Sequence, residues 1–135
     1  MATLTQDRAT PLRASEDFGF PVAASTKLYA GSIACINSSG YLTKGAVATT
    51  LKCVGVMQAA ADNSAGAAAA ITGKVKRGCF KFLNSASTDL IALADVGADC
   101  YIVDDQTVAK TNGSNARSVA GKIRDVESDG VWVEI

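Results

Sequence analysis

The chain has 135 residues, with 13 basic and 13 acidic side chains and no histidine. Its length allows one ordinary domain, and its zero net charge removes the long-range attraction that draws proteins to nucleic acids or to anionic membranes. Because histidine, the commonest general base and metal ligand, is absent, we expect no enzyme activity and no metal or cofactor. The zero net charge leads us to expect no nucleic-acid or membrane partner.

The apolar residues predict a thin core. They make up 48% of the chain, but 24 of them are alanine and only eight are aromatic. Burying alanine removes little surface from water, so we expect the subunit to gain stability from an oligomer or from a larger partner. Residues 1–20 hold no apolar stretch of signal-peptide length and no run reaches transmembrane length, so we expect synthesis in the cytoplasm.

Residues 1–26 differ from the rest because they hold both prolines and show neither a helical nor a strand period. We interpret them as an extended N-terminal arm, ahead of a β-rich domain at residues 27–135. A terminus that contacts nothing is the alternative. Two of the four phenylalanines lie in this segment, which favours contact with another surface. The residues expected to make that contact are Leu4, Leu12, Phe18, Phe20 and Val22.

Short strand-like runs begin after Lys27. Leu28–Asn37 is apolar and β-branched, and Asn37–Gly40 has the composition of a turn that leads into a strand at Tyr41–Thr43. Leu51–Met57 predicts a further strand.

The middle of the chain contains a loop, a long strand pattern and a helix pattern. Ala59–Ala70 is rich in small residues and predicts a surface loop. Ile71–Leu83 is the longest strand pattern, in which Gly78 shifts the phase and indicates a bulge or bend. Thr88–Asp95 predicts one short helix with Thr88 as its N-cap.

The last third of the chain again predicts strands. Cys100–Val103 is a compact buried run, and Val119–Ile135 predicts a hairpin with its turn at Glu127–Gly130. Two turn lengths fit, so the register stays open. The pattern as a whole predicts an all-β domain, a small barrel or sandwich of about seven to eight short strands with one or two short helices. In the last strand one face is expected to carry Val131, Val133 and Ile135, and the other Trp132.

The cysteines are too widely spaced for a zinc site, because the chain has neither a CxxC pair nor a histidine. Two disulfides are possible in principle, but nothing in the sequence indicates secretion. Each cysteine lies in an apolar stretch. We therefore interpret the cysteines as small side chains buried in strands. They are Cys35, Cys53, Cys79 and Cys100.

Charge is segregated along the chain although its total is zero. Residues 44–81 hold six basic residues and one acidic residue, whereas residues 82–109 hold five aspartates and no basic residue. Two sheet faces that neutralise each other within one subunit are one interpretation. The other is a basic edge that meets an acidic edge of a neighbouring copy, which favours a ring. The residues expected in such inter-subunit contacts are Lys74, Lys76, Arg77, Lys81, Asp99, Asp104 and Asp105.

Two apparent motifs fail on their spacing. Gly66–Lys74 has six residues between its glycines and Val75 after the lysine, so it lacks the hydroxyl residue of a phosphate-binding loop. Asp104 and Asp105 are adjacent, and adjacent strand residues point to opposite faces, so their carboxylates converge poorly on a cation.

Three runs, taken in order, resemble one family of small phage structural proteins. They are ADNSAGAAAAITGKVKRGCFKF at residues 61–82, DVGADCYIVDDQTVAK at residues 95–110 and SVAGKIRDVESDGVWVEI at residues 118–135. The family is that of the bacteriophage capsid decoration, or cement, proteins. The resemblance extends over roughly residues 20–135, with an arm of comparable character before it.

The resemblance implies a β-rich virion protein that binds the outer surface of an assembled phage head and bridges copies of the major capsid protein. It also implies a homo-oligomer, with a trimer as the commonest state and a dimer as the alternative, and no catalytic residues. Arms in this family typically pair with capsid segments, which fits residues 1–26. Another phage β-module, such as a tail or baseplate component, fits the composition equally well, and a small-ligand-binding barrel is a third class without a supporting site.

Overall fold

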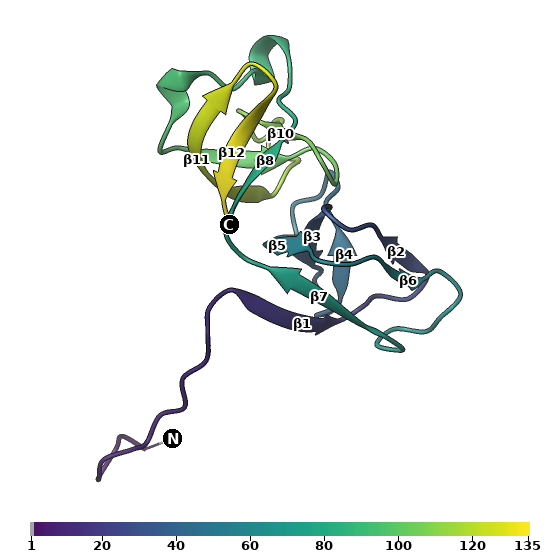
Figure 1. Ribbon diagram of the computed structural model, residues 1–135, viewed down its shortest axis with the longest axis vertical. Helices are drawn as coiled ribbons and strands as arrows, with labels where there is room; N and C mark the ends of the chain where they lie inside the picture. Colours follow the sequence, from purple (N-terminus) through teal and green to yellow (C-terminus); the bar gives the residue numbers. More distant parts are fainter. Residues whose placement is uncertain (1) are drawn as a thin grey trace.

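A computed structural model describes residues 2–135, and the fold is all-β (Figure 1). Two five-stranded sheets and one two-stranded ribbon, all antiparallel, account for the strands of these residues. Sheet I has the order β1 (Asp17–Pro21), β7 (Thr72–Lys76), β5 (Lys52–Met57), β3 (Ile33–Ile36) and β4 (Leu42–Lys44). Sheet II has the order β10 (Val108–Ala109), β9 (Asp99–Ile102), β11 (Val119–Glu127), β12 (Gly130–Glu134) and β8 (Cys79–Phe82). The ribbon pairs β2 (Thr26–Leu28) with β6 (Ala61–Asn63).

The expected all-β fold is therefore confirmed, and its form is a sandwich without a closed barrel. One core cluster joins sheet I to sheet II and includes Ile33 and Cys35 from β3. The second cluster lies on the other side of sheet I, where Ala34 packs with residues of the ribbon such as Leu28 and Ala61. Successive residues of a strand point to opposite faces, so β3 contributes to both clusters.

Gly78 separates two strands that the sequence pattern joined into one. We expected a bulge or bend within Ile71–Leu83, but the chain leaves sheet I after β7 and enters sheet II at β8. The carbonyl oxygen of Gly78 accepts the N–H of Ile135 at 2.9 Å, and the N–H of Arg77 reaches the carbonyl oxygen of Glu16 at 2.7 Å. These bonds satisfy the backbone where it passes between the sheets.

The predicted helix at Thr88–Asp95 does not form. Two 3-10 turns, η1 (Ser87–Asp89) and η2 (Leu93–Asp95), flank a fully buried Ile91. The side chain of Asn84 takes both backbone groups of Ile91, accepting its N–H at 3.0 Å and donating to its carbonyl at 2.9 Å. A residue whose N–H and C=O are both bonded in this way cannot join a helical ladder, which explains the interruption.

The expected surface loop at Ala59–Ala70 contains strand β6 and a buried polar residue. Asn63 is 3% exposed, and its side-chain amide donates to the carbonyl oxygens of Ala23 and Ala67, each at 2.9 Å. A short polar side chain that bonds backbone groups on both sides fixes the segment against the rest of the fold.

Two local predictions are confirmed. Asn37–Gly40 forms a turn, closed by the Gly40 N–H on the carbonyl oxygen of Asn37 at 3.0 Å. In the C-terminal hairpin Glu127 pairs with Gly130. Val131 and Val133 are fully buried, Ile135 packs against the same cluster, and Trp132 lies on the opposite face. The pairing of Glu127 with Gly130 across a two-residue turn sets the register that the sequence left open, and the pairing then shifts by one residue between Ile123 and Asp125.

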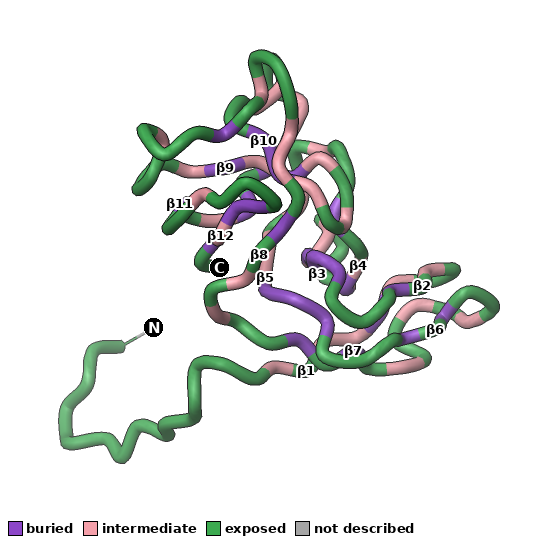
Figure 2. The backbone as a smooth tube through the Cα atoms, turned by 45° about the horizontal axis from the view of Figure 1, so that its top comes forward, coloured by how far each residue is buried: buried purple, intermediate pink, exposed green. Residues whose placement is uncertain are grey.

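The N-terminal arm is shorter than predicted. Strand β1 pairs with β7 along its whole length, β2 lies in the ribbon, and Val22 is 0% exposed in the second core cluster. Residues 2–16, which precede the first strand, have no strand pairing, and all of them are exposed, as the green N-terminal segment of Figure 2 shows. The domain therefore begins at Asp17, and Val22 belongs to its core.

We predict that Gly55→Ala destabilises the fold far more than Gly31→Ala. Both glycines have positive φ, +143° and +85°. A Cβ at Gly55 would clash with the carbonyl oxygen of Lys76, whereas one at Gly31 would meet nothing within 4 Å. We expect the free energy of unfolding to fall by about 3 kcal/mol or more for Gly55→Ala, and by about 1–2 kcal/mol for Gly31→Ala, measured by urea denaturation. Equal losses would contradict a close approach of β5 to β7.

Candidate interaction surfaces

We call residues 2–16 the N-terminal arm. This arm leads directly into β1, the edge strand of sheet I. Figure 1 shows it projecting from the body of the molecule before the chain enters β1. Strand β1 is an edge because β7 is its single neighbour in sheet I. An edge strand keeps one row of backbone N–H and C=O groups available for pairing with another chain. Of the expected contact residues, Leu4 and Leu12 lie in this arm and are 72% and 97% exposed.

The two phenylalanines of the predicted arm lie in β1 and have different surroundings. Their rings stack with centroids 6.1 Å apart, as expected for residues two apart on one strand face. Phe20 packs against the second core cluster. Phe18 lies under the guanidinium of Arg13, 4.4 Å from its ring centroid. Phe20 thus anchors β1 to the domain, whereas Phe18 connects the domain surface to the end of the arm.

Two open depressions flank Phe18. One, of about 470 Å³, is lined by Asp17, Phe18, Gly19, Gln58, Thr72 and Lys74. The other, of about 440 Å³, lies between the arm and the chain's C-terminus and includes Glu16, Arg77 and Ile135 in its lining. Gln58 donates to a carboxylate oxygen of Asp17 at 2.6 Å. Open hollows beside a half-buried ring suit a protein contact better than an enclosed small-molecule site.

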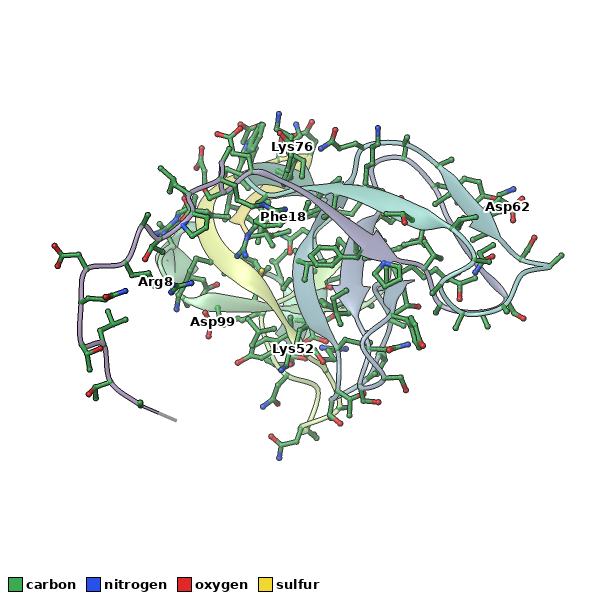
Figure 3. All side chains as sticks on the ribbon, turned by 90° about the horizontal axis from the view of Figure 1, so that it is seen from below. Arg8, Phe18, Lys52, Asp62, Lys76 and Asp99 are labelled. Carbon is green, nitrogen blue, oxygen red and sulfur yellow. The ribbon has the colours of Figure 1, made fainter. Side chains whose placement is uncertain are left out.

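Strand β7 presents a basic face. Gly73 and Val75 are buried, so the alternating residues Lys74 and Lys76 point outward together with the adjoining Arg77. None of these three cations takes part in an ion pair among residues 2–135. Figure 3 shows the side chain of Lys76 extending from the molecule. The cations are therefore available to an acidic partner.

The acidic loop at Asp104 and Asp105 lies at the opposite edge of sheet I. The carbonyl oxygen of Asp104 is 2.8 Å from where a Cβ would stand on Gly45, the residue after edge strand β4. The Asp105 carbonyl accepts the N–H of Ile33 at 2.8 Å. Neither carboxylate forms an ion pair among the described residues. Basic β7 and this acidic loop are thus separate patches with opposite charge.

Two residues expected in inter-subunit contacts have partners within the chain. Lys81 lies 2.9 Å from Asp129, and Asp99 lies 2.7 Å from Lys122. The hydrogen bond to Asp129 raises the pKa of Lys81, and the same bond lowers the pKa of Asp129. These exposed pairs contribute little to stability, but they leave Lys81 and Asp99 less available to a neighbouring copy.

The intramolecular ion pairs do not join the basic block to the acidic block. Three of the five aspartates in residues 82–109 pair instead with bases from residues 110–135. The hydrogen bond from Thr111, followed by that from Arg117, lowers the pKa of Asp89. Within the described residues the two blocks therefore do not neutralise each other as pairs. The pairs are Asp89–Arg117, Asp95–Lys110 and Asp99–Lys122.

Residues 2–135 contain no group of three or more Cys, Asp or Glu side chains placed to hold a metal ion. The helices of this part of the chain are two 3-10 turns of three residues, and neither has the length to cross a bilayer. No family model, curated protein or solved structure matches the chain.

Sequence reasoning missed two residues that make contacts in the surface around β1, Arg13 and Gln58. Arg13 covers Phe18, and Gln58 bonds Asp17 from a segment 41 residues away. Neither contact follows a helical or strand spacing, so no local pattern signals it. Cys79 also differs from expectation, because its side chain is exposed, whereas Cys35 and Cys100 are buried and Cys53 is partly buried.

We predict that Phe20→Ala lowers the free energy of unfolding by about 2 kcal/mol or more, and that Phe18→Ala lowers it by less than half as much. The reason is that Phe20 packs on the second core cluster, whereas Phe18 is covered by a side chain of the exposed arm. Urea denaturation of the two variants measures the difference. A larger loss for Phe18→Ala would contradict the anchoring role of Phe20.

Proposed function

We propose that this chain is a capsid decoration protein, which binds the outer surface of an assembled phage head and stabilises it by bridging major capsid protein subunits. The observation that carries the proposal is the exposed arm at residues 2–16, continuous with edge strand β1. The resemblance of residues 61–82, 95–110 and 118–135 to this family gives the class of partner.

The arm is long enough to reach a neighbouring protein. Fifteen extended residues span about 50 Å, which exceeds the width of several paired strands. Added to the edge of a capsid sheet, the arm would gain backbone hydrogen bonds for affinity, and Leu4 and Leu12 would supply side-chain register. Ordering it costs about 1–2 kcal/mol per residue in backbone entropy, so one arm alone binds modestly.

Attachment therefore depends on several arms acting together. When one arm of an oligomer is bound, the linked arms meet their sites at high effective concentration. The free cations of β7 and the acidic loop at Asp104 and Asp105 support such an oligomer, since β7 lies next to edge strand β1 whereas the loop lies beside the opposite edge strand, β4. A contact between two different patches is heterologous, and it forms a ring where the rotation between copies closes, which favours a trimer over a two-fold dimer.

A tail or baseplate component is the second candidate. An exposed arm and a β-sandwich serve such assemblies equally well, because strand addition works on any open sheet edge. The two candidates differ in the particle that retains the protein, so co-sedimentation with purified heads or with purified tails distinguishes them.

Deletion of residues 2–12 is predicted to abolish capsid retention without unfolding the domain. This deletion keeps Arg13, Glu16 and the whole of β1, whereas a deletion that reached Val22 would remove a core side chain. We expect an unchanged thermal midpoint for the free protein and at least a tenfold loss of co-sedimentation with assembled heads. A scrambled sequence at residues 2–12 controls for arm length and charge.

Three outcomes would contradict the proposal. Full retention of the truncated protein on heads would show that the arm is idle. Retention by the scrambled arm equal to that of the native arm would show that side-chain register does not matter. Binding of the full chain to purified tails but not to heads would favour the second candidate.

Charge reversal tests the contact between copies. We predict that Lys74→Glu and Asp104→Lys each weaken self-association several-fold, because each places like charges opposite one another at a contact rim. The double variant restores attraction and recovers much of the loss. Sedimentation velocity across a concentration series measures the association, and Lys122→Glu, which alters an intramolecular pair, serves as a control. Failure of the double variant to recover would contradict this pairing.

A further inference from the structure

Two of the cysteines lie directly opposite each other in the interior of sheet I. Cys35 in β3 and Cys53 in β5 are partners in the antiparallel register. Both side chains belong to the face that packs toward sheet II, Cys35 within the core cluster and Cys53 against it. Both are thiols in this structure, and each shifts the pKa of the other.

The register places the two cysteines at disulfide-forming distance. Directly opposed residues of an antiparallel pair have Cα atoms about 4.5–5.5 Å apart, and disulfides span Cα separations of about 4.4–6.8 Å. Because opposed residues also point to the same face, their Cβ atoms need no rotation of the backbone to face each other.

The two thiols differ in their surroundings in a way that assigns their roles. Cys53 is partly exposed. Its interaction with the Cys35 thiol, followed by the effects of the Gly55 backbone and the charge of Arg77, lowers the pKa of Cys53 against the effect of burial. Cys35 is fully buried, and its interaction with Cys53 together with burial raises its pKa. Cys53 therefore reacts first and Cys35 second.

We propose that Cys35 and Cys53 form a redox-active pair that closes to a cross-strand disulfide when the protein meets a small-molecule disulfide oxidant. The Cys53 thiolate attacks one sulfur of the oxidant, forms a mixed disulfide and releases one equivalent of thiolate. Cys35 loses its proton and attacks the Cys53 sulfur, which releases the second equivalent. Two protein thiols become one disulfide, and one small disulfide becomes two thiols, so electrons and protons balance.

The disulfide would link β3, the strand on which both core clusters depend, to β5. The cross-link joins residues 18 positions apart and encloses β4, which is an edge of sheet I. It restricts the unfolded chain and leaves the folded register unchanged. The pair would be open in a reducing cytoplasm and closed outside the cell. This inference rests on the register of β3 and β5 and does not depend on the proposed capsid role.

The test is to oxidise the folded protein with oxidised glutathione and map the products. A Cys79→Ser background removes the exposed thiol, which would otherwise form mixed or intermolecular disulfides. Cleavage after lysine and arginine places the remaining cysteines in separate peptides. These are residues 28–44 for Cys35, 53–74 for Cys53 and 82–110 for Cys100. Intact mass, peptide mapping and the thermal midpoint are measured before and after oxidation.

We expect the loss of two hydrogens, a cross-linked species containing 28–44 and 53–74, and a thermal midpoint higher by roughly 5–10 °C that a reductant reverses. Cys53→Ser in the same background should lose no hydrogens and show no such rise. Cys100→Ala should oxidise as its parent does. The peptide map of the parent is informative even if a variant fails to fold.

Four results would overturn the inference. They are a cross-link between 28–44 and 82–110, a glutathione adduct that persists on Cys53 without closing, full alkylation of both thiols after exposure to the oxidant, and loss of two hydrogens by Cys53→Ser. An unchanged thermal midpoint after closure would refute the stabilising consequence and leave a disulfide without a role in the fold.

Discussion

The burial of β3 on both of its faces is the constraint on which the rest of the structure depends. Ile33 and Cys35 face sheet II, and Ala34 faces the ribbon, each with 0% exposure. A strand covered on one face can tolerate solvent on the other, but a strand covered on both requires two further layers. Sheet II and the ribbon supply these layers. The backbone bond from the Ile33 N–H to the carbonyl oxygen of Asp105 then joins sheet I to the acidic loop, so the position of that loop also follows from β3.

Features governed by local chemistry could be predicted from the sequence, and features governed by distant contacts could not. The turn at Asn37–Gly40 and the C-terminal hairpin form as expected because turn residues and a period of two suffice to specify them. The helix expected from Thr88 fails because Asn84 takes both backbone groups of Ile91, an arrangement that no propensity reports. Gly78 was identified as a point of irregularity, but a pattern within one segment cannot reveal that β7 and β8 pair with strands from opposite ends of the chain.

The interaction surfaces, too, include features that local sequence predicts and features that only distant contacts determine. The sequence located an unpatterned N-terminal segment, but it could not separate the isolated apolar residues that anchor the domain from those left exposed. Val22 is in the core and Leu12 is exposed, although both belong to the same unpatterned segment. Pairing along β1 makes the difference, because it draws residues 17–21 into sheet I. Charge behaves similarly. The separation into basic and acidic blocks is visible in sequence, whereas the partners that occupy Lys81 and Asp99 become visible only after folding.

Small side chains serve packing in this fold, which changes what the composition implies. A Cβ on Gly73 would lie 2.6 Å from a methyl carbon of Leu42, and one on Gly45 would lie 2.8 Å from the Asp104 carbonyl oxygen. At such positions the absence of a side chain permits close approach, so the abundance of small residues reflects dense packing as well as a shortage of apolar area. A thin core is therefore a weak reason to expect an oligomer. A stronger reason for the proposed oligomer is on the surface, where Lys74 in β7 and Asp104 beside the end of β4 have no ion-pair partner among the described residues and lie toward opposite sides of sheet I.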